Sequence, residues 1–511
     1  MPPSTTALPT ITIQVVGVLI EARFMRGLIG VQVTQVINLP AQCELTFSDP
    51  PGALPTPTPL LPGIEIRVLI DGSDVPLFVG QVTAVEHVYT AAREKHLRVR
   101  AYDPLHRLRK RQTVRAFSDV SLSDLASQFA GDAGLSVQSE ADSPTWHSLI
   151  QTEQSDYEFL IALAERCGLY LTVRDGTLHL ITLVGTGEAL PLKLGESLME
   201  ARVEVNGHDS ARQITAEGWN AGNLERFDGQ IGSARSGRSI EAQVLPADVG
   251  ANEDFILVNE AAGDASQIAQ LAQAELDRRI ANEVTLWGVA SGDPALQPGA
   301  IVDASGLDHE VSGRYVLTEC RHTVDTEMGY VTEFSTRVAE PPRRPRAAVL
   351  APATVSAIED PDSQARVRVR LITYQNVETD WMPVLLHASG ANKGLIALPD
   401  LDDQVMVLFA GEDPAQGIVL GGVYGGWGSR ITPPDTGIES GQRQRFTFLT
   451  PGGQRIRMDD SGGLVRVENN DGSYLEMTPT AVKLHSQQDM TVEAPGKKLV
   501  ITASMVDFVQ G

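Results

Sequence analysis

The sequence of 511 residues contains few aromatic side chains, little cysteine and no long apolar run. Aromatic residues make up only 5%, whereas 46 glycines and 30 prolines favour short strands and turns over long helices. No stretch approaches 18 apolar residues, which excludes a transmembrane helix. The N-terminus lacks the basic and apolar regions of a signal peptide, so we expect synthesis in the bacterial cytoplasm without export by that route.

Cysteine is too sparse to form a disulfide framework. Cys43, Cys167 and Cys320 are far apart in the sequence and form no CxxC motif. Such a pattern is typical of buried free thiols in a protein made in a reducing compartment.

Positive charge is also scarce: the sequence has 41 Lys and Arg but 65 Asp and Glu, which gives a net charge of −24. An acidic surface repels nucleic acid and anionic membranes unless a local basic patch overrides it. One basic stretch, residues 93–115, holds nine Lys and Arg. Two interpretations of this stretch stay open, a docking surface for an acidic partner and a solvated strand face.

Enzyme motifs are absent: the sequence has no HExxH, GxSxG, GxxxxGK[ST] or strand-linked GxGxxG pattern. The glycines at 421–428 indicate turns, and Asp400, Asp402 and Asp403 indicate a solvated loop more than a metal site. The ten histidines are scattered singly. We therefore predict no enzymatic activity, no cofactor and no metal site, while a catalytic pair formed only by folding stays open.

The hydrophobic pattern predicts a mainly β protein with a few helices. Alternation of apolar and polar residues predicts strands at 11–16, 64–70 and 97–102, among others. Helical periodicity occurs at about 121–131, 156–168 and 264–282, the last with Asp264 as N-cap and Gln267 at the capping-box position. Residues 341–349 form a proline-rich linker, and about 80 residues after it predict a small closed barrel.

The C-terminal residues show a different pattern, in which two apolar residues flank a single intervening residue. Successive pairs recur every seven to ten residues, with turn-forming residues in most of the gaps. One short strand per repeat buries too little by itself, so stacked coils or identical segments of other chains are expected to cover the pairs. The alternative is an ordinary β-meander that closes a monomer. The candidate packing residues are Ile456, Met458, Val465, Val467, Leu475, Met477, Val482, Leu484, Met490, Val492, Leu499, Ile501, Val506 and Phe508.

Several of these segments resemble the VgrG-type spike of contractile injection systems, related to the phage late control D hub fused to its spike. Residues 154–160 (QSDYEFL), followed by LAE at 163–165, are similar to a specific motif of the family's hub. Residues 381–384 (WMPV) and 398–409 (LPDLDDQVMVLF), with a later DP and IVLGGVY, resemble its spike-base OB-fold. Asp402 and Glu412 stand at two turn positions where the family usually has glycine.

The resemblance implies a homotrimer in which each chain contributes two β-barrels to the hub. The implied domains are a hub-like region at 1–340, the linker at 341–349, an OB-fold at 350–430, a second linker at 431–446 and a β-helix at 447–511. Three C-terminal segments would then form a triple-stranded β-helix, and the pairs of apolar residues would pack at the trimer axis.

The implied function is mechanical. The trimer would connect the hexameric inner tube to baseplate proteins and puncture the target membrane when a sheath contracts. His485 is the last histidine and no HxH follows it, so a separate PAAR-type tip protein is expected at the C-terminal end. The protein would be incorporated into a phage tail-like particle. Phage tail, type VI secretion and extracellular particle all stay open, as does release from the cell.

Two rival functions also stay open from the residues alone. A β-helical polysaccharide-degrading protein would need a cleft of catalytic residues along one face. A carbohydrate-binding tail protein or adhesin would need a route out of the cell, for which the sequence carries no signal peptide.

Overall fold

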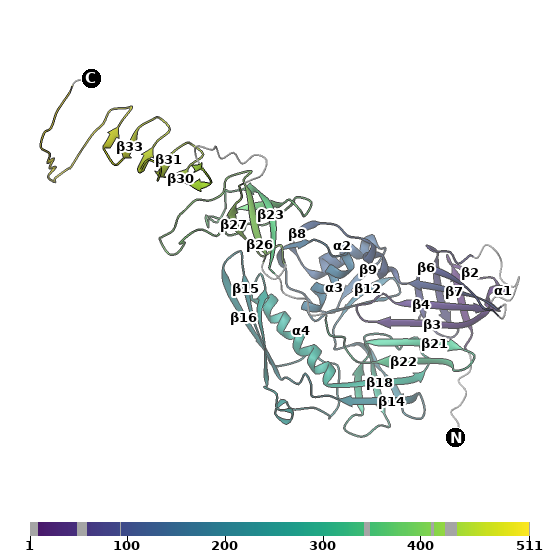
Figure 1. Cartoon of the computed structure of the whole chain (residues 1–511). Helices are drawn as coiled ribbons and strands as arrows, with labels where there is room; N and C mark the ends of the chain where they lie inside the picture. The colour runs from purple at the N-terminus through teal and green to yellow at the C-terminus, as the bar shows by residue number, and fades with distance from the viewer. Residues whose placement is uncertain are drawn as a thin grey trace. The chain divides into compact units, whose positions relative to one another are not determined.

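The computed structural model describes residues 9–48, 59–91, 94–341, 348–409, 413–424 and 437–509. These residues form a mainly β protein with four α-helices, as the sequence predicts (Figure 1). The helices are α1 (Ala22–Met25), α2 (Leu122–Asp132), α3 (Asp156–Arg166) and α4 (Ala265–Glu283). The three long helices confirm the three predicted segments, and the short α1 was not predicted.

Local capping explains where the long helices begin. The hydroxyl groups of Ser121 and Ser155 accept from the backbone three residues later, and Asp124 and Glu158 return the bond in full capping boxes. Asp264 caps α4 as predicted. The side chain of Gln267, however, accepts from the backbone nitrogen of Gly263 at 2.8 Å, one residue before the N-cap.

The largest sheet has eleven strands in the order β14-β18-β22-β21-β3-β4-β7-β6-β5-β1-β2. Strands β3 and β21 pair antiparallel although almost 300 residues separate them in the sequence. The strands are β1 (Ile11–Val15), β2 (Val18–Leu19), β3 (Leu28–Val36), β4 (Gln42–Ser48), β5 (Glu65–Ile70), β6 (Phe78–Tyr89), β7 (Lys95–Tyr102), β14 (Leu198–Val205), β18 (Val284–Ser291), β21 (Glu319–Asp325) and β22 (Gly329–Ser335).

The implied pair of hub barrels is not seen in the single chain. Across the residues that the structure describes, these strands form one continuous row whose end strands, β14 and β2, each have one neighbour. The period-two pattern of a strand is the same in an open sheet and in a barrel, so the sequence could not separate the two arrangements.

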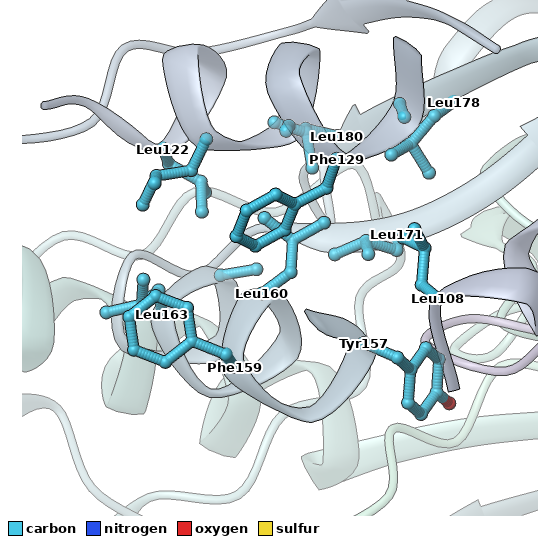
Figure 2. Packing of buried hydrophobic residues seen from close by; sticks show 14 of the residues in the cluster. Leu108, Leu122, Phe129, Tyr157, Phe159, Leu160, Leu163, Leu171, Leu178 and Leu180 are labelled. Atoms are coloured by element: carbon cyan, nitrogen blue, oxygen red, sulfur yellow. The ribbon is translucent and has the colours of Figure 1, made fainter. Parts of the chain in front are cut away.

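Helices α2 and α3 pack together beside two small sheets. The sheets consist of β8 (Arg115–Val120) with β10 (Trp146–Gln151), and of β9 (Ser136–Ser139), β11 (Tyr170–Arg174) and β12 (Thr177–Ile181). Figure 2 shows Phe129 of α2 and Leu160 of α3 pointing toward one another, with leucines of the strands beside them. Both side chains are fully buried, so this cluster holds α2, α3 and these strands together.

Helix α4 covers one face of a three-stranded sheet of β15 (Gln213–Asn220), β16 (Glu225–Ile231) and β17 (Asp254–Ala261). Strands β13 (Thr186–Lys193), β19 (Ala300–Ser305) and β20 (Gly313–Val316) form another sheet. Arg238 donates to the carbonyl oxygens of Ile280 and Ala281, which satisfies backbone groups in the last turn of α4.

The five-stranded sheet after the linker has the order β25-β24-β23-β26-β27. Its strands are β23 (Val349–Ala357), β24 (Arg368–Leu371), β25 (Val377–Glu378), β26 (Gln404–Phe409) and β27 (Gly417–Gly422). Val355, Val369 and Val407 are fully buried in its own core. The loop between β23 and β24 is fastened by Asp360, which accepts from the Nε and Nη2 atoms of Arg366 at 3.0 and 2.8 Å.

Chain contacts divide the molecule into two compact units, residues 1–422 and 423–511. In the second unit, β28 (Ile438–Glu439) and β29 (Gln442–Arg443) form a hairpin. A five-stranded antiparallel meander follows, which we call the terminal sheet. Its strands are β30 (Arg445–Leu449), β31 (Arg455–Asp459), β32 (Leu464–Glu468), β33 (Tyr474–Met477) and β34 (Val482–His485).

Candidate functional site

The terminal sheet separates its side chains into an apolar face and a polar face. Strand pairing places Ile456 opposite Val467, and Val467 opposite Leu475, in one row across the strands. A parallel row contains Met458, Val465, Met477 and Val482. Because side chains alternate between faces along a strand, both rows lie on the same face. The structure therefore brings together the first four predicted pairs of residues.

The apolar face also includes two phenylalanines that are not among the predicted pairs. Phe448 pairs with Ile456, and Phe446 pairs with Met458, so each extends one of the two rows onto β30. The sequence predicts a linker at 431–446, of which residues 431–436 lie outside the described part. From Ile438 onward the structure has strands. The FTF pattern, which begins ten residues before the next pair, could have revealed this strand.

The last three predicted pairs of apolar residues are not in strands. Met490, Val492, Leu499, Ile501, Val506 and Phe508 lie in residues 486–509, where the structure assigns no strand or helix. Their side chains are exposed, and Phe508 has 93% of its surface accessible. These residues have no partner layer within the described part of the single chain.

The apolar face itself is open to solvent in the single chain. Exposure of its large side chains ranges from 37% at Leu475 to 71% at Val482, except for Val465, which is half-buried. A contiguous apolar face of this kind marks an interaction site more often than a free surface. Covering one such side chain contributes about 2 kcal/mol. The face is thus the strongest candidate for an assembly surface in the chain.

The polar face carries a network of ion pairs. Arg455 pairs with Glu468 at 3.3 Å, and Arg466 pairs with Glu468 and Glu476 at 2.6 and 2.8 Å. Arg445 binds Asp459 across β30 and β31. The pKa of the Asp459 carboxyl is lowered, first by the Ser461 hydroxyl and then by Arg445. The two faces therefore have opposite chemical character.

The basic stretch at 93–115 is largely engaged in contacts within its own chain; Arg93 lies outside the described residues. Arg115 pairs with the buried carboxylate of Asp156 at 2.7 Å, and Arg111 approaches the same carboxylate at 3.5 Å. Arg109 donates to the hydroxyl of Tyr157 at 3.0 Å. These contacts favour the structural interpretation of the stretch, and a docking role stays a prediction.

A cavity of about 1140 Å³ lies between the hub strands and the OB-type sheet. Residues of β10, α3 and the β15–β16 turn line one side, and Arg366, Asp380 and Trp381 line the other. Gln416 accepts a hydrogen bond from the backbone nitrogen of Ala221 at 2.9 Å across this joint. His147 also bridges it, with Nε2 at 3.0 Å from an oxygen of Asp380.

Within the described ranges, no group of three His, Cys, Asp or Glu side chains is placed to hold a metal ion. Asp400 and Asp403 close a turn, in which the backbone nitrogen of Asp400 donates to a carboxylate oxygen of Asp403 at 2.8 Å. Burial raises the pKa of all three cysteine thiols, which makes them poor nucleophiles. No helix in the described residues is long and apolar enough to cross a membrane.

Comparison with known families gives two matches along the chain. The model described as Alg8 N-terminal domain matches residues 5–326, and the model described as type VI secretion system/phage-baseplate injector OB domain matches residues 351–424. No curated protein is similar enough to match.

Two solved structures share the fold at low identity. One is an Escherichia coli component of the type VI secretion system, described as similar to the T4 bacteriophage tail proteins gp27 and gp5. It is 12% identical, with 80% of this chain and 99% of that chain covered and a TM-score of 0.51. The other is a chain of the half-lidded Francisella PdpA–VgrG complex. It is 10% identical, with 94% and 88% covered and a TM-score of 0.53.

Proposed function

Since this chain belongs to the family of the Alg8 N-terminal domain, as a VgrG-like component of the phage-baseplate or type VI secretion type, we propose that three copies form the hub and central spike of a contractile injection machine. The observation that carries the proposal is the apolar face of the terminal sheet. Two further copies of the same face would cover it around a three-fold axis.

The geometry of the terminal sheet supports three copies over a closed monomer. In the single chain the apolar face of this five-stranded meander stays exposed to solvent, and burying it against further copies would be favourable. In a three-sided β-helix, each chain would contribute one sheet with its apolar face inward and its ion-paired face outward.

The proposed action is mechanical, and it requires no chemical step by this chain. The hub region at 1–340 would hold the hexameric tube and contact baseplate proteins, and the OB-fold at 350–430 would form a collar. Sheath contraction would then drive the spike through the target membrane. The exposed side chains of Val506 and Phe508 support a capping partner of the PAAR type.

Light scattering after size exclusion tests this proposal on the intact protein. We expect a trimer, and we expect Leu475→Glu to dissociate it because a carboxylate would enter the apolar axis. Thr447→Glu, on the polar face of the same sheet, is the matched control and should remain trimeric. A stable monomer of the unaltered protein would reject the spike function and favour the alternative, a β-helical carbohydrate-degrading or carbohydrate-binding tail protein.

A further inference from the structure

The polar face of the terminal sheet has more arginines than its carboxylates neutralise. Its strands carry three carboxylates, on Asp459, Glu468 and Glu476, and each one contacts an arginine. The basic residues on this face are Arg445, Arg455, Arg457, Arg466 and Lys483. Positive charge therefore exceeds negative charge on one face of a strongly acidic protein.

Arg457 lies on the same face but outside this network of ion pairs. It pairs with no carboxylate in the part of the chain that the structure describes. Its Nε atom is buried without a hydrogen-bond acceptor, while its two terminal nitrogens are not enclosed. A cation in such a place keeps its full charge available for a ligand from outside the chain.

The position of Arg457 in the sheet also favours the binding of an anion. Strand pairing places Arg457 directly opposite Arg466 on β32. Like charges directly opposite one another on neighbouring strands destabilise a sheet. Glu468 and Glu476 offset the charge of Arg466, but neither pairs with Arg457. An anion held by Arg457 would relieve this repulsion.

The charge of the whole chain is distributed in a way that favours the same partner. Residues 423–511 contain nine Lys and Arg and ten Asp and Glu, a net charge of −1. The remaining −23 of the chain's −24 belongs to residues 1–422. The hub and OB region thus repels anionic surfaces, whereas the second unit does not.

We propose that Arg457, supported by Arg466, binds the phosphate head groups of an anionic membrane when the spike enters it. This inference rests on the proposed function, which directs the polar face outward in the trimer. A guanidinium forms two parallel hydrogen bonds with phosphate oxygens, a geometry that a carboxylate-paired arginine cannot offer. Three copies would present three such groups around the spike.

Vesicle flotation of the intact trimer tests the inference. We expect binding to vesicles of phosphatidylcholine with phosphatidylglycerol, and little binding to phosphatidylcholine alone. Arg457→Gln should weaken binding about fivefold for each Arg457 that contacts the membrane at one time. Arg457→Lys, which keeps the charge but loses the two parallel hydrogen bonds, should bind more weakly than the unaltered trimer and more strongly than Arg457→Gln. Lys110→Gln, which removes one exposed charge from the basic stretch of the hub, is the matched control and should change nothing.

Four results would overturn the inference. The first is equal binding of the unaltered trimer to both vesicle types. The second is an equal loss of vesicle binding in Lys110→Gln and Arg457→Gln. The third is a clear loss of the trimer's heat resistance in Arg457→Gln, because the guanidinium would then be paired between chains. If inorganic phosphate at millimolar concentration abolishes vesicle binding, the site binds free phosphate, and this result would also contradict the proposed binding to membrane head groups. A monomer, in contrast, would reject the proposed function itself.

Discussion

The Nε2 atom of His147 lies 3.0 Å from the Oδ2 atom of Asp380. Its other ring nitrogen, Nδ1, lies 2.8 Å from a carboxylate oxygen of Asp119. Neutral imidazole has one N–H group, so both bonds form only when the ring is protonated. Asp119 belongs to β8 of the hub, whereas Asp380 follows β25 and also approaches Arg368 at 3.3 Å. The joint between hub and OB-type sheet thus contains a titratable bridge.

This bridge predicts a pH dependence of the joint. The hydrogen bond to Asp119 and, secondarily, the charge of Asp380 raise the pKa of His147 above its usual value. A raised pKa in the folded state stabilises the joint below the ordinary histidine pKa, and this contribution disappears as the pH rises through the folded pKa. His147 is largely exposed, so the effect on stability is small, below about 1 kcal/mol.

NMR titration of the His147 ring checks this prediction. Asp119→Asn and Asp380→Asn should each lower the pKa of His147, and Asp119→Asn should lower it more. An unchanged titration curve in both variants would mean that the imidazole does not contact these carboxylates in solution.

Asp360 is predicted to stabilise the OB-type sheet. Besides Arg366, it accepts from the backbone nitrogens of Asp362 and Gln364. The Arg366 side chain lowers the pKa of the Asp360 carboxyl well below its usual range. Its contribution is therefore present above the ordinary aspartate pKa, near pH 4, and is lost as the pH falls toward the lowered value.

Denaturant unfolding measures this contribution. Asp360→Asn should lower the free energy of unfolding by about 2 kcal/mol at neutral pH, because charge-assisted bonds are lost. The control is Asp362→Asn, whose carboxylate pairs with the same arginine but is 63% exposed; it should cost less than about 1 kcal/mol. Equal losses in the two variants would contradict the assignment.

Gly80 is predicted to be irreplaceable because strand β7 lies against it. A Cβ atom at Gly80 would stand 2.3 Å from the carbonyl oxygen of Tyr102. We expect Gly80→Ala to destabilise the hub by about 1–3 kcal/mol. Gly131, in α2, has no atom within 4 Å of such a Cβ. Gly131→Ala should therefore stabilise the protein by up to about 1 kcal/mol, and thermal unfolding of both variants compares the two.

Phe448 is predicted to extend the apolar axis onto β30. In the trimer that we propose, Phe448→Ala should lower the heat resistance of the spike, since a large buried ring would be lost. Leu449 lies next to it but on the polar face, so Leu449→Ala should change little. If both variants keep the heat resistance of the unaltered trimer, residues 445–449 lie outside the axis.

Local features of the fold could be predicted from the sequence, and distant pairings could not. The starts of α2, α3 and α4 depend on Ser121, Ser155 and Asp264, whose capping partners lie within three residues. The pairing of β3 with β21 depends on two strands that alternate like many others, so no local pattern selects the partner. The pairing of Arg115 with Asp156 has the same cause, because both residues are ordinary charges until the chain folds.

The apolar face shows the same limit within one element. The spacing of Ile456 and Met458 identified them as a pair, but it did not show that Phe446 and Phe448 join them. Only strand register does so. Whether the pairs of residues meet at a three-fold axis stays a prediction, since the single chain contains one of the three proposed layers.

Within the residues that the structure describes, every strand of the terminal sheet pairs with strands next to it in sequence. Pairings between strands that are so close in sequence form quickly, because little chain entropy is lost in closing each turn. Each chain can therefore complete its own sheet soon after synthesis, before it meets another copy. In the trimer that we propose, residues 445–485 of each copy would then associate as sheets that are already formed, so these segments would not have to thread around one another.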